Sequence, residues 1–171
     1  MMLSPLMNRD NLSVYISEWK GKGLKIVFTN GVFDILHLGH VDYLTKARAL
    51  GDVLIVGVNN DESVRRLNKA PERPINPEYA RATLLSALKC VDATIIFGED
   101  TPLELIQDIL PDVLVKGGDY DPQETDAQSK QYMVGSDIVR ASGGRVAAIP
   151  LVEGYSTTGI LAKGQTKLGD I

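Results

Sequence analysis

Short apolar runs alternate along this chain with segments of helical periodicity. Five runs rich in aliphatic and β-branched residues are predicted to be buried strands, at 24–29, 53–58, 93–97, 112–116 and 145–149. Helices are predicted at 41–50, 62–67, 77–89 and 102–110, with one ending near 142 and a short one after 156. Alternating strands and helices at this spacing favour right-handed crossovers. We therefore predict an α/β fold with a doubly wound, five-stranded parallel sheet and helices on both faces.

Polar and apolar residues also predict where elements begin and how the chain divides. Three polar residues are expected to be helix N-caps: Asp61, Asn76 and Thr101. Residues 1–23 have the spacing of one amphipathic helix on the edge of the domain. We expect the main domain at 24–162 and a flexible tail at 163–171.

Composition narrows the class of protein. The 171 residues are 44% hydrophobic and 23% charged, close to the globular average, and the formal net charge of −4 argues against a nucleic-acid binder. The sequence has no signal-peptide pattern and no apolar run long enough to span a membrane. Its one cysteine, Cys90, lies in an apolar run and is expected to be a buried, inert thiol. We expect a soluble, cytoplasmic protein without nucleic-acid or membrane partners.

The loop after the first predicted strand has the composition of an anion site. Gly31 permits a tight turn there and leaves neighbouring N–H groups exposed. A helix is predicted to start near Leu38 or Gly39, and its N-terminus would direct further N–H groups at the same space. The glycine fingerprints of dinucleotide-binding proteins and of P-loop proteins are absent, which disfavours ordinary dehydrogenases and P-loop kinases.

The chain's only two histidines stand at this helix entry. His37 and His40 are three residues apart, so both side chains are predicted to face the anion, and Gly39 between them leaves room for a ligand. Unrelated surface or capping histidines are the simpler interpretation. A zinc site is disfavoured because only carboxylates such as Asp34 are near enough to complete it. The pairing favours binding or catalysis on a phosphate.

These residues resemble the signature of the HxGH nucleotidylyltransferases, at 31–34 (Gly-Val-Phe-Asp) and 37–40 (His-Leu-Gly-His). The resemblance implies a Rossmann-like fold and attack of a phosphate oxygen on the α-phosphorus of a nucleoside triphosphate, with Mg²⁺ present and pyrophosphate released. Such chemistry requires positioned donors and positive potential rather than a protein nucleophile.

The resemblance also assigns roles to individual residues. His37, His40 and the mobile lid residue Lys69 would be catalytic, and Asp34 would lie at the entry of the sugar phosphate. The implied nucleotide contacts are Thr29, Asn30, Gly31, Val32, Phe33, Gly39, Arg81, Lys116, Gly117, Asp119, Ser156, Thr157 and Thr158. Each has a simpler interpretation: the hydroxyl run could be only an N-cap, Lys116 could extend to solvent, and the cations around Lys69 could be a solvated helix face. The remaining cations of that loop, Arg65, Arg66 and Arg73, are interpreted as surface residues.

Within the family, longer strings are most similar to the adenylyltransferases of D-glycero-β-D-manno-heptose 1-phosphate. The strings are residues 29–31, 73–77, 110–120 and 154–158. The resemblance implies ATP and a sugar phosphate as substrates, a homodimer and a separate sugar kinase upstream. Glycerol-3-phosphate cytidylyltransferase is the alternative, disfavoured because Leu151 and Val152 replace its usual Arg-Thr. A catalytically inactive nucleotide-binding regulator is the alternative of another class. The polar stretch 123–130 receives no role.

Overall fold

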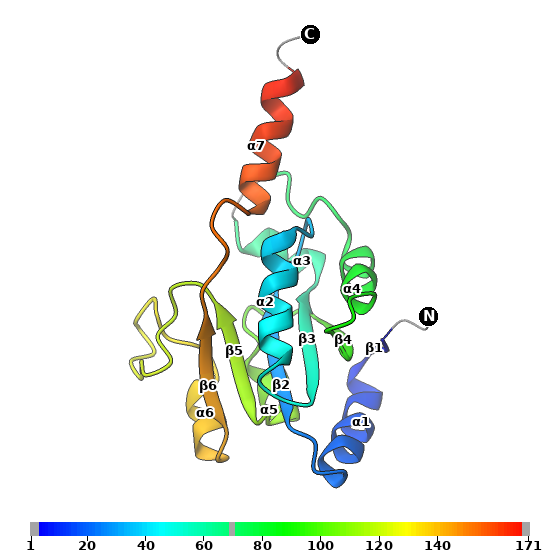
Figure 1. Cartoon of the computed structure of the whole chain (residues 1–171), viewed down its shortest axis with the longest axis vertical. Helices are drawn as coiled ribbons and strands as arrows, with labels where there is room; N and C mark the ends of the chain where they lie inside the picture. Colours follow the sequence, from blue (N-terminus) through cyan, green and yellow to red (C-terminus); the bar gives the residue numbers. More distant parts are fainter. Residues whose placement is uncertain (1–3, 69–70, 169–171) are drawn as a thin grey trace.

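A single parallel sheet with strand order β1-β4-β3-β2-β5-β6 is the centre of the fold, as the computed structural model shows for residues 4–68 and 71–168 (Figure 1). Its strands are β1 (Leu6–Met7), β2 (Ile26–Gly31), β3 (Val53–Asn59), β4 (Ala93–Phe97), β5 (Val113–Gly117) and β6 (Arg145–Ile149). The predicted parallel α/β architecture is confirmed, and β2 to β6 match the five predicted runs. The predicted number of strands is wrong, because the sheet has six.

The additional strand comes from the N-terminal segment. In β1, Leu6 and Met7 pair with Thr94 and Ile95 at the edge of the sheet. Two residues are too short to show the alternation that identifies a strand in a sequence. The segment before residue 23 thus contributes a strand as well as a helix to the domain, and the boundary expected there stays a prediction.

The helices are α1 (Arg9–Gly21), α2 (Leu38–Arg48), α3 (Asp61–Arg66), α4 (Glu78–Ser86), α5 (Leu103–Ile109), α6 (Ser136–Ala141) and α7 (Thr157–Leu168). The predicted N-caps Asp61, Asn76 and Thr101 are each wrong by one residue; Asn60, Pro77 and Pro102 occupy the cap positions. Asn60 has extended backbone, so its side chain can accept a hydrogen bond from the Ser63 N–H at 2.8 Å.

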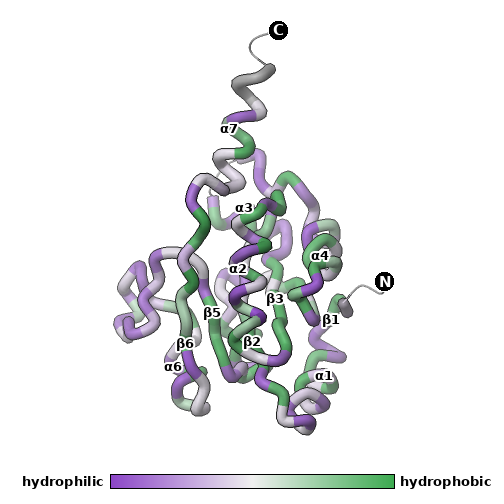
Figure 2. The backbone as a smooth tube through the Cα atoms, viewed as in Figure 1, coloured by the Kyte–Doolittle hydropathy of each residue, from purple (hydrophilic) through white to green (hydrophobic). Residues whose placement is uncertain are grey.

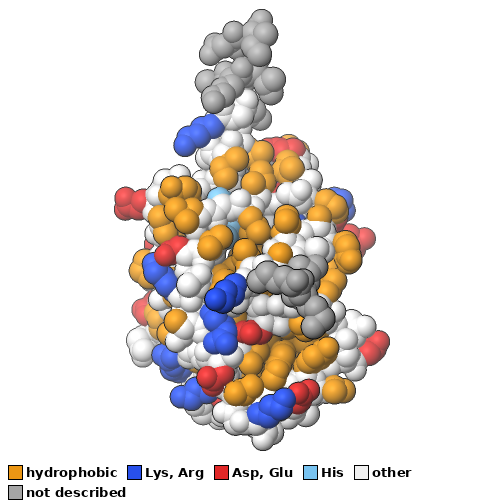
Figure 3. Space-filling view, turned by 45° about the vertical axis from the view of Figure 1, so that its right-hand side comes forward, with side chains coloured by type: hydrophobic (Ala, Val, Ile, Leu, Met, Phe, Trp, Pro, Cys, Tyr) orange, Lys and Arg blue, Asp and Glu red, His pale blue; other side chains and the backbone are white. Residues whose placement is uncertain are grey.

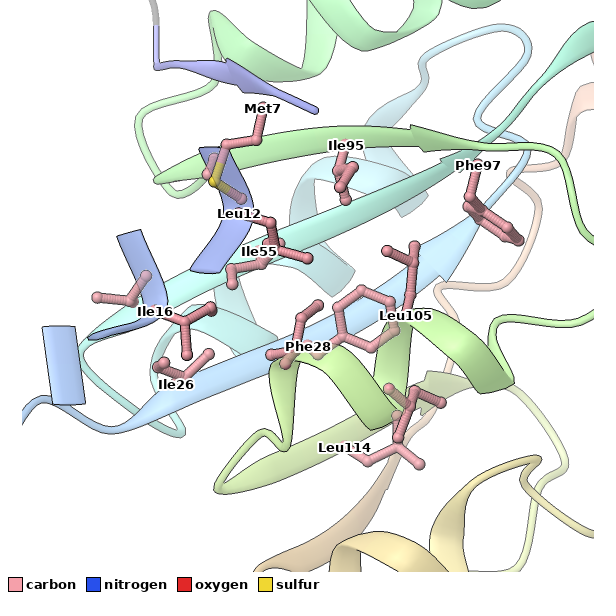
Figure 4. Close-up of a cluster of buried hydrophobic side chains, with 14 of the residues drawn as sticks. Met7, Leu12, Ile16, Ile26, Phe28, Ile55, Ile95, Phe97, Leu105 and Leu114 are labelled. Atoms are coloured by element: carbon pink, nitrogen blue, oxygen red, sulfur yellow. The ribbon is translucent and has the colours of Figure 1, made fainter. Parts of the chain in front are cut away.

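Both faces of the sheet are covered, as a doubly wound fold requires. One face packs on α1, α5 and α6 through a cluster that includes Ile16, Phe28 and Leu105 (Figure 4). The other packs on α2 and α4 around Leu44 and Leu85. Figure 2 shows the resulting pattern, with hydrophobic residues concentrated along the inner strands and hydrophilic ones along the loops.

Three sequence-based expectations concern the rest of the chain. Helix α7 stands out from the body and extends past residue 163 to Leu168, so it crosses the expected start of a tail, although that boundary is not tested (Figure 1). Cys90 is only partly buried, packed against the core after α4, so the buried thiol expected from the sequence is found only in part. Across residues 4–68 and 71–168, every helix is too short or too polar to cross a membrane.

The order of the strands determines where a ligand can bind. From β2 the chain moves to β3 and β4 on one side, then crosses to β5 and β6 on the other side. In open parallel sheets a crevice forms at such a switch point, outside the carboxyl ends of the strands. Here the switch point lies between β2 and β5, where the histidine segment and the Lys116 segment both leave the sheet.

Candidate active site

A cleft of about 520 Å³ opens at this switch point. It is lined from β2, β3, β5 and α2, and from the loops that follow β4 and β5. The sequence-predicted site residues that line it are Asn30, Gly31, Val32, Phe33, His40, Lys116 and Gly117. The loop after β2 and the segment around Lys116 are therefore brought together in one cavity, whereas His37 is not among the residues that line it.

The two histidines stack on each other at the start of α2. His37 is the N-cap residue and His40 lies in the first turn, with ring centroids 3.8 Å apart and planes 17° apart. Both Nδ1 atoms are buried without a hydrogen-bond partner among residues 4–68 and 71–168. Histidine surface is visible below α7 in the space-filling view (Figure 3). The stack therefore fixes the two rings relative to each other at the start of α2.

Phe33 supports the histidine pair from the side. Its ring meets that of His40 edge-on, with centroids 5.2 Å apart. To reach this position Phe33 adopts a backbone φ of 50°, which is rare for a residue with a bulky side chain. A Cβ on Gly31 would lie 3.0 Å from the Phe33 ring, so the glycine makes room for this support. The strained backbone is consistent with a functional loop.

Burial keeps both imidazoles neutral near pH 7. It lowers the pKa of His37, and it is also the main reason that the pKa of His40 falls to about 4, with His37 adding to the shift. A hydrogen bond with the backbone of Ile35 raises the pKa of His40, but it offsets only part of this lowering. A neutral imidazole has one N–H donor. A phosphate bound in the cleft would favour the charged form and raise both pKa values.

The low pKa of His40 predicts a loss of stability in acid. Between the ordinary histidine pKa of 6.5 and about 4, the unfolded chain binds a proton that the folded chain does not, so the free energy of unfolding falls as pH falls. The expected contribution is about 1–2 kcal/mol, reduced by partial exposure of the ring. Urea unfolding at pH 7 and pH 4.5 would measure it. The fall should be smaller in His40→Gln, and equal falls in the two proteins would contradict the assignment.

The predicted hydroxyl run lies next to the histidine pair rather than along the cleft. A Cβ on Gly39 would lie 3.1 Å from the His37 ring and 3.3 Å from the Cβ of Tyr155, so this glycine lets the two segments meet. Thr157 is buried, whereas the two hydroxyl residues beside it are exposed, and Ser156 Oγ accepts a hydrogen bond from the Gly159 N–H at 3.0 Å. The run therefore caps α7, and its phosphate contacts, including those of Thr158, stay predictions.

Lys116 brings positive charge to the switch point. Its ammonium donates a hydrogen bond to the side-chain oxygen of Asn30, which bridges the ends of β5 and β2. Thr29 is fully buried and shares a 2.6 Å hydrogen bond with the Tyr43 hydroxyl.

Asp119 is exposed and does not line the cleft, so its predicted nucleotide contact stays a prediction.

Asp34 has a different environment from the one expected for a substrate ligand. Its carboxylate is fully buried and accepts hydrogen bonds from the backbone N–H groups of Ile75 and Asn76, each at 2.9 Å to Oδ1. Burial would raise its pKa, but these bonds and the Arg73 guanidinium outweigh burial and lower it. In this structure Asp34 anchors the loop before α4 instead of facing the cleft.

Arg81 is also placed differently from its prediction. Its side chain is fully buried and donates to Asn76 O, Val32 O and Asp61 Oδ1 at 2.7–2.8 Å. The guanidinium therefore ties α4 to α3 and to the histidine loop, and it does not project into the cleft. Lys69, the predicted lid residue, lies outside the described residues.

Several cleft residues were missed by sequence reasoning. They are aromatic or polar side chains from four different segments: Tyr43, Asn59, Thr101, Tyr120 and Tyr132. Only Asn59 had a signal in the sequence that could have identified it, because it is a polar residue at the end of an apolar strand. The others lie in a helix or in loops whose approach to the cleft depends on the tertiary structure.

Comparison with known proteins agrees with this geometry. A family model described as cytidylyltransferase-like matches residues 28–163, which include the histidine pair, the Lys116 segment and the hydroxyl run. The chain belongs to the cytidylyltransferase-like family. The resemblance to the nucleotidylyltransferases is thereby confirmed at the level of the family.

The chain is also similar to two proteins described as bifunctional protein HldE. The chain is 47% identical over 161 residues to the bifunctional protein HldE of Azorhizobium caulinodans, and 52% identical over 160 residues to that of Trichlorobacter lovleyi. Each match covers 94% of this chain but only 32% and 31% of the relatives, so the chain spans about a third of their length.

Two solved structures are also similar to this family member. A lipopolysaccharide core biosynthesis protein from Thermoplasma volcanium is 34% identical with a TM-score of 0.57, over 78% of this chain and 100% of that one. Pantoate-β-alanine ligase from Francisella tularensis, solved with an ATP analogue and β-alanine, is 18% identical with a TM-score of 0.53, over 94% of this chain and 77% of that one. The second likeness supports the fold alone.

Proposed function

We propose that this domain transfers AMP from Mg·ATP to D-glycero-β-D-manno-heptose 1-phosphate, forming ADP-heptose and pyrophosphate. The observation that carries the proposal is the stacked pair of His37 and His40 at the N-terminus of α2, of which His40 lines the cleft together with Lys116. Membership of the cytidylyltransferase-like family supports nucleotidyl transfer. The similar lipopolysaccharide core biosynthesis protein supports a sugar acceptor, and the choice of heptose rests on resemblance.

The reaction needs stabilisation of charge rather than a protein nucleophile. An ionised oxygen of the sugar phosphate attacks the α-phosphorus in line, and the bond from that phosphorus to the bridging oxygen of pyrophosphate breaks. Negative charge grows on the α-phosphoryl oxygens and on the leaving pyrophosphate. In this proposal the imidazole N–H groups of His37 and His40 and the Lys116 ammonium donate to this charge; His40 and Lys116 line the cleft, and His37 stacks on His40. Lys69 would add a further cation.

In this proposal Mg²⁺ arrives with the nucleotide rather than on a metal site of the protein. Residues 4–68 and 71–168 contain no cluster of three or more His, Cys, Asp or Glu side chains that could hold one. Mg²⁺ commonly keeps several waters and binds mainly through substrate phosphates. When bound, it would neutralise charge on the leaving pyrophosphate.

The substrates can be tested in four assays of pyrophosphate release, with ATP or CTP against heptose 1-phosphate or glycerol 3-phosphate. We expect release with ATP and heptose 1-phosphate, at a specificity constant at least 100-fold above the other three pairs, because unpaired polar groups in a pocket strongly disfavour a wrong substrate. Release only with CTP and glycerol 3-phosphate would support the cytidylyltransferase alternative. ATP binding without release from any pair would support the inactive regulator.

A further inference from the structure

The loop between α3 and α4 places one more cation, Arg73, against Asp34 in the segment that carries the histidine pair. Arg73 directs its Nε at Asp34 Oδ2 at 3.0 Å, and its side chain is only 12% exposed. A surface arginine would be largely solvated, and the sequence alone suggested such a position. Here the guanidinium is instead fixed from one side by a carboxylate that is itself fully buried.

Asp34 is held rigidly enough to orient this guanidinium. Its Oδ1 accepts the backbone N–H groups of Ile75 and Asn76, and its backbone carbonyl accepts a 2.6 Å bond from Asn76 Nδ2. Arg73 donates its Nε–H to Asp34. Its two terminal nitrogens make no hydrogen bond to any described residue. The fork of an arginine matches two oxygens of a phosphate.

Two observations place Arg73 near the reacting groups. Asp34 lies three residues before His37 in the loop from β2 to α2, so the carboxylate that holds Arg73 belongs to the histidine segment. Asp34 also directly follows Phe33, whose ring meets that of His40 with centroids 5.2 Å apart, and the positive charge of Arg73 helps to lower the pKa of His40. A cation in this position is unfavourable beside an imidazolium, and it becomes favourable when a phosphate lies between them.

We propose that Arg73 contacts a reacting phosphate beside His40, and that Asp34 is the positioning residue that orients Arg73 for this contact. The inference rests on the proposed function. It reverses the assignment made from sequence, in which Arg81 contacts phosphate and Asp34 contacts substrate. The phosphate could belong to ATP or to the sugar phosphate, since both present the same oxygens. The two possibilities differ in which Michaelis constant, that for ATP or that for the sugar phosphate, rises when Arg73 is replaced.

The test compares Arg73→Met and Arg73→Lys with Arg65→Met, an exposed control on α3. For Arg73→Met we expect kcat/KM to fall about 10- to 100-fold, as for loss of one charge-assisted hydrogen bond. Arg73→Lys should recover part of this loss, because a lysine keeps the charge but not the fork. A rise in KM for one substrate identifies the phosphate that is contacted. If kcat/KM of Arg73→Met stays within twofold of Arg65→Met, the proposal is wrong.

Asp34→Asn tests the positioning role, because its amide would direct N–H groups at the Nε of Arg73. The double variant of Asp34→Asn and Arg73→Met should be little worse than either single variant, since both disrupt the same contact. If the fold-losses in kcat/KM of the two single variants multiply in the double variant, Asp34 and Arg73 act independently and the positioning role is wrong.

A measurement without turnover separates this inference from the proposed function. In NMR titrations, Arg73→Met should raise the pKa of His40, whereas Arg65→Met should leave it unchanged, because only Arg73 is placed near that ring. An unchanged His40 pKa in Arg73→Met would overturn the placement even in an active enzyme. Wild-type protein that neither binds ATP nor releases pyrophosphate would instead overturn the proposed function.

Discussion

Replacing His40 by alanine is expected to lower turnover by about two to three orders of magnitude, the cost of one lost transition-state donor. The ring lines the cleft and is held in place by stacking on His37 and by the edge of the Phe33 ring, so it is positioned to contact a ligand bound there. The loss should appear mainly in kcat, because the charge that His40 stabilises grows as the bond to pyrophosphate breaks. Steady-state assays of pyrophosphate release would measure it.

A matched variant separates loss of the donor from loss of packing. His40→Asn keeps a polar N–H near the position of Nδ1 and fills part of the space beside Phe33. If turnover depends on the Nε2 N–H of His40, both His40→Ala and His40→Asn should turn over slowly. Circular dichroism should show that both variants remain folded. Near-normal turnover in His40→Ala would remove the histidine from the mechanism.

Most of the fold could be predicted from sequence because the strands are buried on both faces. β3 is buried over its whole length, and a run of that kind stands out in a sequence without any knowledge of its neighbours. β1 could not be predicted, since two residues show no period and the strand exists only because β4 is there to pair with it. Sequence reasoning therefore located the strands that form the core and missed the one at the edge.

For the site, the sequence predicted the position of residues where the local backbone determines it, whereas the roles of these residues stay predictions. His37, His40 and Gly39 were predicted from the geometry of a helix start, and the structure stacks the two rings there. The predictions for Asp34 and Arg81 did not match the structure, because the role of a charged side chain depends on burial and on partners far away in the sequence. Asp34 meets its partners 39 to 42 residues later, and no local pattern shows that.

Arg81→Leu gives the second large effect, and here we expect it on stability. The substitution removes the donors to Val32 O and Asn76 O and leaves Asp61 without its buried partner. Loss of one member of a buried ion pair typically costs about 3–5 kcal/mol. Urea unfolding should therefore show a much lower free energy of unfolding than in wild type, with Arg65→Met as the exposed control.

Kinetics of the same variant distinguish the two interpretations of Arg81. A buried residue that ties α4 to the histidine loop acts on the site only through folding, so protein that remains folded at low temperature should bind ATP within a few-fold of wild type. A phosphate ligand would give the opposite pattern, with near-normal stability and a KM for ATP raised about 10- to 100-fold, as for one charged hydrogen bond. The hydrogen bonds of Arg81 to Val32, Asn76 and Asp61 favour the first outcome, since they already engage all three of its guanidinium nitrogens.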